Sequence, residues 1–258
     1  MLVTGGANGI GRAIVDIFLQ AGADVCYVDL VASGAAVGFG GASSSTPAGA
    51  HFMQCDVSDP AQIGRAVEKA ITTLGGLDVL VNNVGVHVEA GKPCHEVSLQ
   101  AWDKVIAVNL RSHFLFAKFC LRGAFVPQQS GAIINIGSVH GFQNGPGLPA
   151  YATTKGGILA FTRQLAVEYA PLGIRANVVV PGTINTPMNL NFMEASDEKT
   201  DRSPMGRWGM PSEVAEAVLF LASPKASFIS GESLAADGGL LAKGTWADNE
   251  RPGLTDDR

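Results

Sequence analysis

The chain has 258 residues, of which 47% are apolar and 16% are charged, and its formal net charge is -5. This composition is typical of one soluble α/β domain with a sizeable core and excludes a disordered chain. A mildly acidic chain without a basic cluster is a poor partner for a phosphate backbone, so no nucleic-acid ligand is expected. No apolar run reaches bilayer-spanning length, and the chain enters a glycine-rich turn at once instead of a signal-peptide core. We therefore expect a cytoplasmic protein with no membrane partner.

In chain order, short apolar runs alternate with helix-length amphipathic stretches, which is typical of βαβ units. The predicted strands cover residues 2–4, 24–29, 52–55, 78–82, 132–138, 175–180 and 233–237. The predicted helices cover residues 12–21, 60–74, 99–125, 151–169 and 211–222. The pattern predicts an α/β fold, a single domain built on a doubly wound parallel sheet of about seven strands.

Three segments depart from this alternation. Residues 31–50 carry no charge and too much glycine for a good helix, so a loop or a frayed helix is expected. Residues 185–210 form a long polar connection, and loops of that length are usually functional, which predicts a substrate lid. The charged tail at residues 243–258 is expected to be loosely ordered.

The four cysteines and five histidines show no metal-ligand spacing. The cysteines lie far apart without a CxxC pair, and Cys26 and Cys55 occupy apolar, strand-like runs. We interpret the cysteines as reduced core thiols and expect no metal site.

A glycine-rich turn, T-G-G-A-N-G-I-G at residues 4–11, lies between the first predicted strand and the first predicted helix. Glycines there let backbone N–H groups approach a pyrophosphate at a helix N-terminus. A tight βα turn is the alternative, because such a turn alone is weak evidence. Asp29 favours dinucleotide binding, since an acid at the end of the second strand can accept both ribose hydroxyls. The predicted contacts are Gly5, Asn8, Gly9, Ile10, Gly11 and Asp29.

Polar residues also follow the third and fourth predicted strands, as Asp56-Val57 and as Asn82-Asn83-Val84-Gly85. The carboxyl ends of parallel strands form the edge on which open α/β sheets bind ligands. Capping or turn clusters explain these residues equally well, because Asp and Asn favour such positions.

Ser138 ends the fifth predicted strand, and Tyr151 and Lys155 share one face of the following helix at i,i+4 spacing. A phenol with a pKa near 10 is a poor base at neutral pH, but a neighbouring cation lowers that pKa by roughly 1–3 units. We therefore expect Lys155 to prepare Tyr151 for proton transfer with a substrate oxygen. A surface Tyr/Lys pair is the alternative. The helical Gly156-Gly157 pair argues against it, because each glycine costs about 1 kcal/mol relative to alanine and so indicates a close approach.

Further motifs stand at Asn109 and at Pro181-Gly182-Thr183 with Thr186. Together with the glycine-rich turn, NNVG, Ser138 and the YxxxK of Tyr151 and Lys155, they resemble the short-chain dehydrogenase/reductase family along essentially the whole chain. The resemblance implies a Rossmann-type fold and hydride transfer by a nicotinamide cofactor, for which NAD is expected. Val84 departs from the alanine usual in this family, and the glycine-rich residues 31–50 replace a charged helix.

The resemblance also implies roles for the matched positions. Tyr151 would be the acid/base, Lys155 would hold the nicotinamide ribose, and Ser138 would hydrogen-bond the substrate oxygen. Asn109 would anchor a water leading to Lys155. The remaining implied cofactor contacts are Asp56, Val57, Asn83, Gly85, Pro181, Gly182, Ile184 and Thr186.

The expected activity is an NAD-dependent interconversion of a secondary alcohol and a ketone. A lipophilic small-molecule substrate such as a terpenoid, steroid or aromatic alcohol is expected, because the expected pocket is mostly apolar. Its residues are Val139, His140, Gln143, Met188, Phe192, Met193 and Trp208. Two alternatives remain. An NADPH-dependent 3-oxoacyl-type reductase would favour a basic residue where this chain has Asp29-Leu30-Val31, and a catalytically silent, NAD-responsive binding protein would share the fold.

A homo-oligomer, and specifically a tetramer, is also expected. The helix containing residues 109–119 and the helix containing Gly156-Gly157 expose more apolar surface than a monomer tolerates. The family commonly pairs these helices across a two-fold axis.

Overall fold

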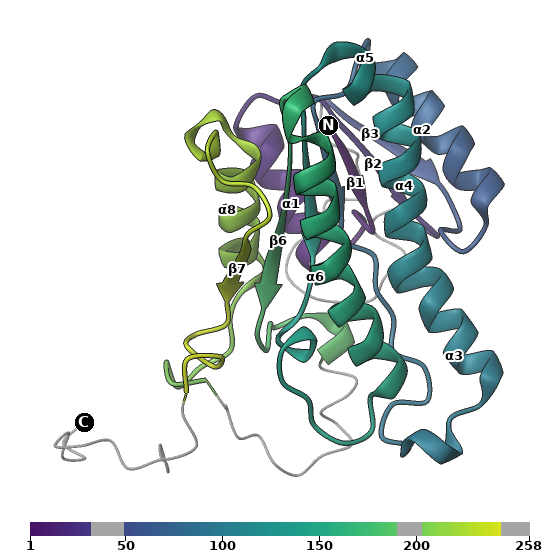
Figure 1. Ribbon diagram of the computed structural model, residues 1–258, viewed down its shortest axis with the longest axis vertical. Helices are drawn as coiled ribbons and strands as arrows, with labels where there is room; N and C mark the ends of the chain where they lie inside the picture. The colour runs from purple at the N-terminus through teal and green to yellow at the C-terminus, as the bar shows by residue number, and fades with distance from the viewer. Residues whose placement is uncertain (32–48, 190–202, 244–258) are drawn as a thin grey trace, which may run out of the picture.

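The computed structural model describes residues 1–31, 49–189 and 203–243 of the chain. Seven parallel strands form one sheet in the order β3-β2-β1-β4-β5-β6-β7, which confirms the predicted doubly wound sheet (Figure 1). The strands are β1 (Leu2–Thr4), β2 (Val25–Asp29), β3 (Ala50–Gln54), β4 (Val79–Asn82), β5 (Gly131–Ile136), β6 (Ile174–Pro181) and β7 (Ser233–Ala236). The strand order reverses between β1 and β4, so the crevice that binds ligands in such sheets opens beside the glycine turn.

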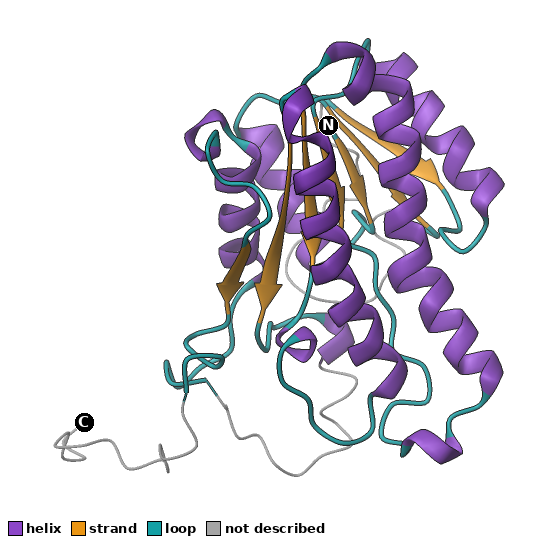
Figure 2. Cartoon of the chain, viewed as in Figure 1, coloured by secondary structure: helices purple, strands orange, loops and turns teal. Residues whose placement is uncertain are grey.

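Helices cover both faces of the sheet, and the strands all run toward the same end of the molecule (Figure 2). One layer contains α1 (Gly9–Gln20) and α8 (Pro211–Ala222), and the other contains α2 (Pro60–Leu74), α4 (Ser112–Cys120) and α6 (Pro149–Tyr169). Alternate strand residues face opposite layers. Leu2 joins the core under α2 and α4, whereas Val3 joins the core under α1 and α8.

The predicted helix at residues 99–125 is helical throughout but is not a regular α-helix. It comprises α3 (Leu99–Ile106), a π-helical turn at Ala107–Arg111, α4, and a second π-helical turn at Leu121–Phe125 that leads into α5 (Val126–Gln128). A π turn inserts one residue into the helical repeat and often occurs at functional sites. The first of these turns contains Asn109, which is fully buried.

The prediction that the fifth strand ends at Ser138 is wrong, because β5 ends at Ile136. The Ser138 hydroxyl accepts a hydrogen bond of 3.2 Å from the backbone N–H of His140 and begins a 3₁₀ turn at Val139–Gly141. This local side-chain bond competes with the sheet ladder and turns the chain out of the strand.

Several predictions fall wholly or partly on residues 32–48, 190–202 and 244–258, which lie outside the described residues. They concern the loop at 31–50, half of the lid at 185–210, the tail at 243–258, and the pocket residues Phe192 and Met193. Each of these stays a prediction. Among the helices that the structure describes, none combines the length and the apolar character needed to cross a bilayer. The same residues contain no group of three or more His, Cys, Asp or Glu side chains placed to hold a metal ion.

Candidate active site

The glycine turn is folded tightly against the end of β2. The backbone N–H groups of Gly5 and Gly6 both donate to the Val28 carbonyl oxygen, at 2.7 and 3.3 Å. A Cβ atom at Gly11 would lie 1.9 Å from the Gly5 carbonyl oxygen, so no larger residue fits there. The missing side chain at Gly11 therefore lets the first turn of α1 pack directly against the glycine turn, at the helix N-terminus that a pyrophosphate would approach.

Asn8 precedes α1, and its side chain makes no capping hydrogen bond to the part of the chain that the structure describes. The first N–H groups of a helix need an outside acceptor, which a phosphate oxygen can supply. Asp29 lies next to this turn, where its Oδ2 accepts a hydrogen bond of 3.1 Å from the Ala7 N–H. These features fit the adenosine and pyrophosphate of a dinucleotide at Gly5, Asn8, Gly9, Ile10, Gly11 and Asp29.

The side chains of Asn83 and Asp56 are engaged with nearby protein groups. Asn83 Nδ2 donates to the carbonyl oxygens of Thr4 and Gly5, at 2.9 and 3.2 Å, and so ties the end of β4 to the glycine turn. The Asp56 carboxylate accepts hydrogen bonds from the hydroxyl and the backbone N–H of Ser58, which lower the pKa of Asp56. For both residues these contacts match the turn-cluster alternative, and a direct cofactor contact stays a prediction.

Of the other predicted cofactor residues, two lie in the hydrophobic cores and three lie at or just after the end of β6. Val57 and Ile184 are buried in the cores on either side of the sheet. Gly182 lies close to β7, because a Cβ atom there would stand 2.8 Å from Asp237 Cα. Pro181 ends β6, and the buried Thr186 follows, with its Oγ1 accepting a hydrogen bond of 3.4 Å from the Asn189 N–H.

Lys155 lies on α6 and is buried beneath the end of β5, where Nζ donates a hydrogen bond of 2.8 Å to the Ile136 carbonyl oxygen. Burial lowers the pKa of Lys155 to about 8. A Cβ atom at Gly85 would lie 3.8 Å from Lys155 Nζ and 4.0 Å from Asn109 Oδ1. Gly85 therefore brings the loop after β4 directly against both predicted catalytic groups.

Tyr151 is two residues inside the N-terminus of α6, and its phenol hydrogen-bonds with Ser138. Burial raises the pKa of Tyr151, and the hydrogen bond with Ser138 lowers it by less. The expectation that Lys155 lowers this pKa is wrong for this arrangement. The ammonium is bound to the Ile136 carbonyl and lies 5.4 Å from the centre of the phenol ring.

Asn109 joins the loop after β4 to α6. Its Oδ1 accepts a hydrogen bond of 2.8 Å from the Val86 N–H, and its Nδ2 donates to the Val86 carbonyl oxygen at 3.0 Å and to Thr154 Oγ1 at 3.4 Å. The side chain thus clamps Val86, one residue beyond Gly85. The water that the family resemblance assigns to Asn109 stays a prediction.

His87 is a residue of this site that the sequence analysis missed. Its imidazole lies roughly perpendicular to the Tyr151 ring, with 4.2 Å between the ring centres. Burial lowers the pKa of His87 to about 4, with smaller contributions from Lys155 and His140. A signal was present in the sequence, because His87 stands two residues after Gly85 in a loop at the carboxyl edge of the sheet.

The predicted substrate-pocket residues do not all meet at Tyr151. His140 does, with 5.8 Å between its ring centre and that of Tyr151. Val139 is packed into the core with Ile158 and Leu159. Gln143 is exposed and donates to the Leu240 carbonyl oxygen at 3.4 Å, and Met188 is also exposed.

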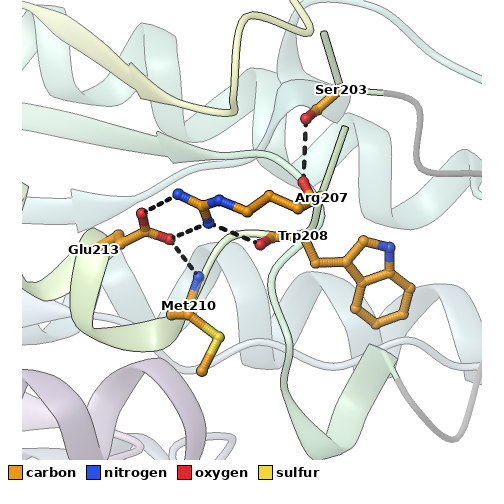
Figure 3. Close-up of polar contacts among 5 residues, drawn as sticks. All are labelled: Ser203, Arg207, Trp208, Met210 and Glu213. Atoms are coloured by element: carbon orange, nitrogen blue, oxygen red, sulfur yellow. Dashed lines mark hydrogen bonds and ion pairs between the residues drawn. The ribbon is translucent and has the colours of Figure 1, made fainter. Parts of the chain in front are cut away.

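Trp208 is held by a polar cluster at its neighbouring residues. Arg207 forms an ion pair of 2.6 Å with Glu213 of α8 and donates to the Trp208 carbonyl oxygen at 3.0 Å. Glu213 also accepts a hydrogen bond from the Met210 N–H, and the Ser203 hydroxyl donates to the Arg207 carbonyl oxygen (Figure 3). These bonds lower the pKa of Glu213 to about 2. The indole of Trp208 points away from the ion pair (Figure 3).

Comparison with known proteins agrees with this architecture. The family model described as enoyl-(acyl carrier protein) reductase matches residues 5–241. The chain is 38% identical to 2-(S)-hydroxypropyl-CoM dehydrogenase 3 of Xanthobacter autotrophicus over 248 residues (93% of this chain, 95% of the relative). It is 37% identical to the 3-oxoacyl-(acyl-carrier-protein) reductase FabG of Aquifex aeolicus (93% of this chain, 96% of the relative).

Among solved structures, ElxO with NADP bound superposes with a TM-score of 0.84 at 30% identity, covering 94% of this chain and 98% of ElxO. Short-chain dehydrogenase/reductases use a nicotinamide cofactor, and the glycine turn of this chain fits one. The matched family model, the relatives along nearly the whole chain and the common fold lead to one conclusion. The chain belongs to the short-chain dehydrogenase/reductase family and is an oxidoreductase of that family.

Proposed function

We propose that this protein is an NAD-dependent oxidoreductase that interconverts a secondary alcohol and a ketone. The observation that carries the proposal is the group of Ser138, Tyr151 and Lys155 at the carboxyl edge of the sheet, in which Ser138 and Lys155 are buried and Tyr151 is half-buried. The loop after β4 touches this group through Gly85 and also touches the glycine turn, because a Cβ atom at Gly5 would lie 2.9 Å from Val84 Cγ2. A reacting centre and a dinucleotide turn are thus joined by one short loop.

In this proposal each side chain has one task. Tyr151, as the phenolate, takes the proton from the alcohol oxygen during oxidation and, as the phenol, returns it during reduction. Ser138 orients the same oxygen by a hydrogen bond and stabilises the charge that develops on it. Lys155 holds the hydroxyls of the nicotinamide ribose. The cofactor, when bound, supplies the hydride chemistry.

The choice of NAD over NADP rests on Asp29. Its Oδ2 accepts a hydrogen bond from Ala7 in the glycine turn and its Oδ1 accepts one from Leu30, which holds the carboxylate beside the predicted ribose position. A 2′-phosphate there would meet a charge of the same sign. Arg12, a cation close to the turn, forms an ion pair of 2.8 Å with Asp16. Since ElxO binds NADP on the same fold, the preference has to be measured in this protein.

For the substrate we propose a lipophilic secondary alcohol such as a terpenoid, steroid or aromatic carbinol. Met188 and Trp208 support this proposal, because both are large apolar side chains on the connection that follows β6. A second candidate is an NADPH-dependent 3-oxoacyl-type reductase, which the 37% identity to FabG favours.

Initial rates test both candidates. The purified protein is expected to reduce NAD in the presence of aromatic and terpenoid secondary alcohols, with much lower efficiency for NADP. The rate of NADPH oxidation in the presence of a short 3-oxoacyl thioester tests the second candidate, the 3-oxoacyl-type reductase. Efficient turnover in that arm, with none in the first, would replace the first candidate by the second.

We also propose that the protein acts in the cytoplasm as a homotetramer. Phe114 on α4 and Val167 on α6 are 47% and 78% exposed, and Phe114 stacks edge-on against Phe161 with 6.2 Å between ring centres. Exposed apolar side chains on both helices favour pairing of these helices with those of a second copy. Sedimentation velocity at micromolar concentration is expected to give a tetramer, and a monomer would contradict the proposal.

A further inference from the structure

Two imidazoles contact the ring of the proposed acid/base. His87 comes from the loop after β4, and His140 comes from the 3₁₀ turn after β5. Both rings stand nearly perpendicular to the Tyr151 ring, at interplanar angles of 74° and 77°. Neither histidine is needed for the proton and hydride transfers described above, so their position beside Tyr151 calls for a separate role.

The protonation state of His87 restricts what it can bind. Burial is the largest cause of its pKa of about 4, and the positive charge of Lys155 and the neighbouring His140 act in the same direction. At neutral pH its imidazole is therefore uncharged. A neutral imidazole donates one hydrogen bond and accepts another, which matches a hydroxyl group, since a hydroxyl also does both. A carboxylate can only accept.

His87 and Tyr151 both line a small cavity next to their ring contact. Its volume of about 10 Å³ matches the space that one water-sized group occupies. Val97, Val105 and Leu148 supply apolar walls. Glu89 also lines the cavity, but its carboxylate is already bound to the Ser98 N–H at 2.8 Å and to Lys92 at 3.1 Å. His87 is thus the neutral lining side chain that both donates and accepts a hydrogen bond.

We infer that this cavity is a subsite for a second hydroxyl group, carried on the carbon next to the reacting carbinol, and that the preferred substrates are uncharged vicinal diols and the corresponding α-hydroxy ketones. The inference rests on the proposed function and narrows its substrate class. In the oxidation, a hydride would leave the carbinol carbon for NAD and the hydroxyl proton would pass to the phenolate oxygen of Tyr151. The second hydroxyl stays intact on His87, and a lipophilic remainder extends away from the cavity.

The test compares matched substrates in the full-length protein. The value of kcat/KM is measured with NAD for 1-phenylpropan-1-ol, for 1-phenylpropane-1,2-diol and for the charged analogue 3-phenyl-2-hydroxypropanoate. Because one well-placed hydrogen bond contributes about 0.5–1.5 kcal/mol, the diol is expected to exceed the mono-alcohol by roughly two- to tenfold. Equal efficiencies for diol and mono-alcohol, or a preference for the hydroxy acid, would overturn the inference.

Three variants assign the effect to His87. His87→Phe keeps an aromatic ring beside Tyr151 but removes both hydrogen-bonding atoms, so the ratio of diol to mono-alcohol efficiency is expected to fall to near one. His87→Gln keeps a donor and an acceptor and is expected to retain part of the ratio. His95→Phe is the control, because the His95 side chain is 80% exposed and is not among the residues that line the cavity, and the ratio is expected to stay unchanged. A ratio that does not change in His87→Phe would contradict the inference.

A binding measurement separates this inference from the proposed function. In the unmodified protein with NADH present, addition of the diol is expected to shift the imidazole ¹⁵N resonance of His87, while the mono-alcohol leaves it in place. If no alcohol is oxidised, the proposed function fails, and the resonance still decides whether the diol binds at His87. If mono-alcohols are oxidised but neither the ratio nor the resonance responds to the second hydroxyl, the subsite alone is refuted.

Discussion

Replacement of Asn109 by alanine is expected to lower the free energy of unfolding by about 2–4 kcal/mol. Asn109 is fully buried and makes hydrogen bonds to the N–H and the carbonyl of Val86 and to Thr154. Each such bond contributes about 1 kcal/mol net, and leaving a buried partner unsatisfied adds to the cost. Val86 is only half-buried, so water can hydrogen-bond to its N–H and carbonyl groups in the alanine variant. The expected loss of unfolding free energy therefore stays below the sum of the costs for fully buried, unpaired groups.

The measurement is urea unfolding at one fixed protein concentration, because association would otherwise change the apparent stability. The loss corresponds to a fall in Tm of roughly 5–15 °C for a chain of this size. Amide hydrogen exchange adds a local readout, since the Val86 N–H loses its acceptor and is expected to exchange faster in the variant.

Asn144→Ala is the matched control, because Asn144 is exposed, and its effect is expected to stay within about 0.5 kcal/mol. The clamp on Val86 also holds the neighbouring His87 and Gly85 against the site. The activity of Asn109→Ala is therefore expected to fall by more than the small fraction of unfolded variant in the assay can explain. A stability loss under 1 kcal/mol with normal Val86 protection would refute the reasoning.

Three further predictions concern the reacting groups and the cofactor. Tyr151→Phe is expected to abolish turnover while NAD affinity, measured by fluorescence titration, stays nearly intact; substantial alcohol oxidation by this variant would overturn the assignment. Because the pKa of Lys155 falls from 10.5 to about 8 on folding, the unfolded chain binds more protons between those values. The stability of the unmodified protein relative to Lys155→Met is then expected to rise between about pH 8 and 10.5, and denaturant titrations showing no such rise would contradict it. Asp29→Ser is expected to shrink the preference for NAD over NADP by weakening NAD and relieving repulsion of the 2′-phosphate. Equal kcat/KM for both cofactors in the unmodified protein would show that Asp29 does not lie at the ribose.

The sequence by itself determined the layers of this fold, because the information is local. Alternation of apolar residues within each strand decides which core a side chain enters, as Leu2 and Val3 illustrate. The start of α2 was readable in the same way, since Asp59 accepts hydrogen bonds from the N–H groups of Ala61 and Gln62 ahead of the helix. The spacing of Tyr151 and Lys155 on one helix also needed no tertiary information.

Only the tertiary structure decided how the site is assembled. The π turn that contains Asn109, the short strand that releases Ser138, and the contact of His87 with Tyr151 all depend on segments far apart in the chain. The pKa of Tyr151 depends on burial, which sequence spacing does not report, and so the expected effect of Lys155 was wrong. Gly157 shows the same difference between what the sequence indicates and what the tertiary structure decides. The sequence indicated that something approaches this helix closely, but only the packing identified it as Leu110, which would lie 3.1 Å from an added Cβ atom. Local patterns specify which elements form, whereas contacts between elements determine which side chains meet.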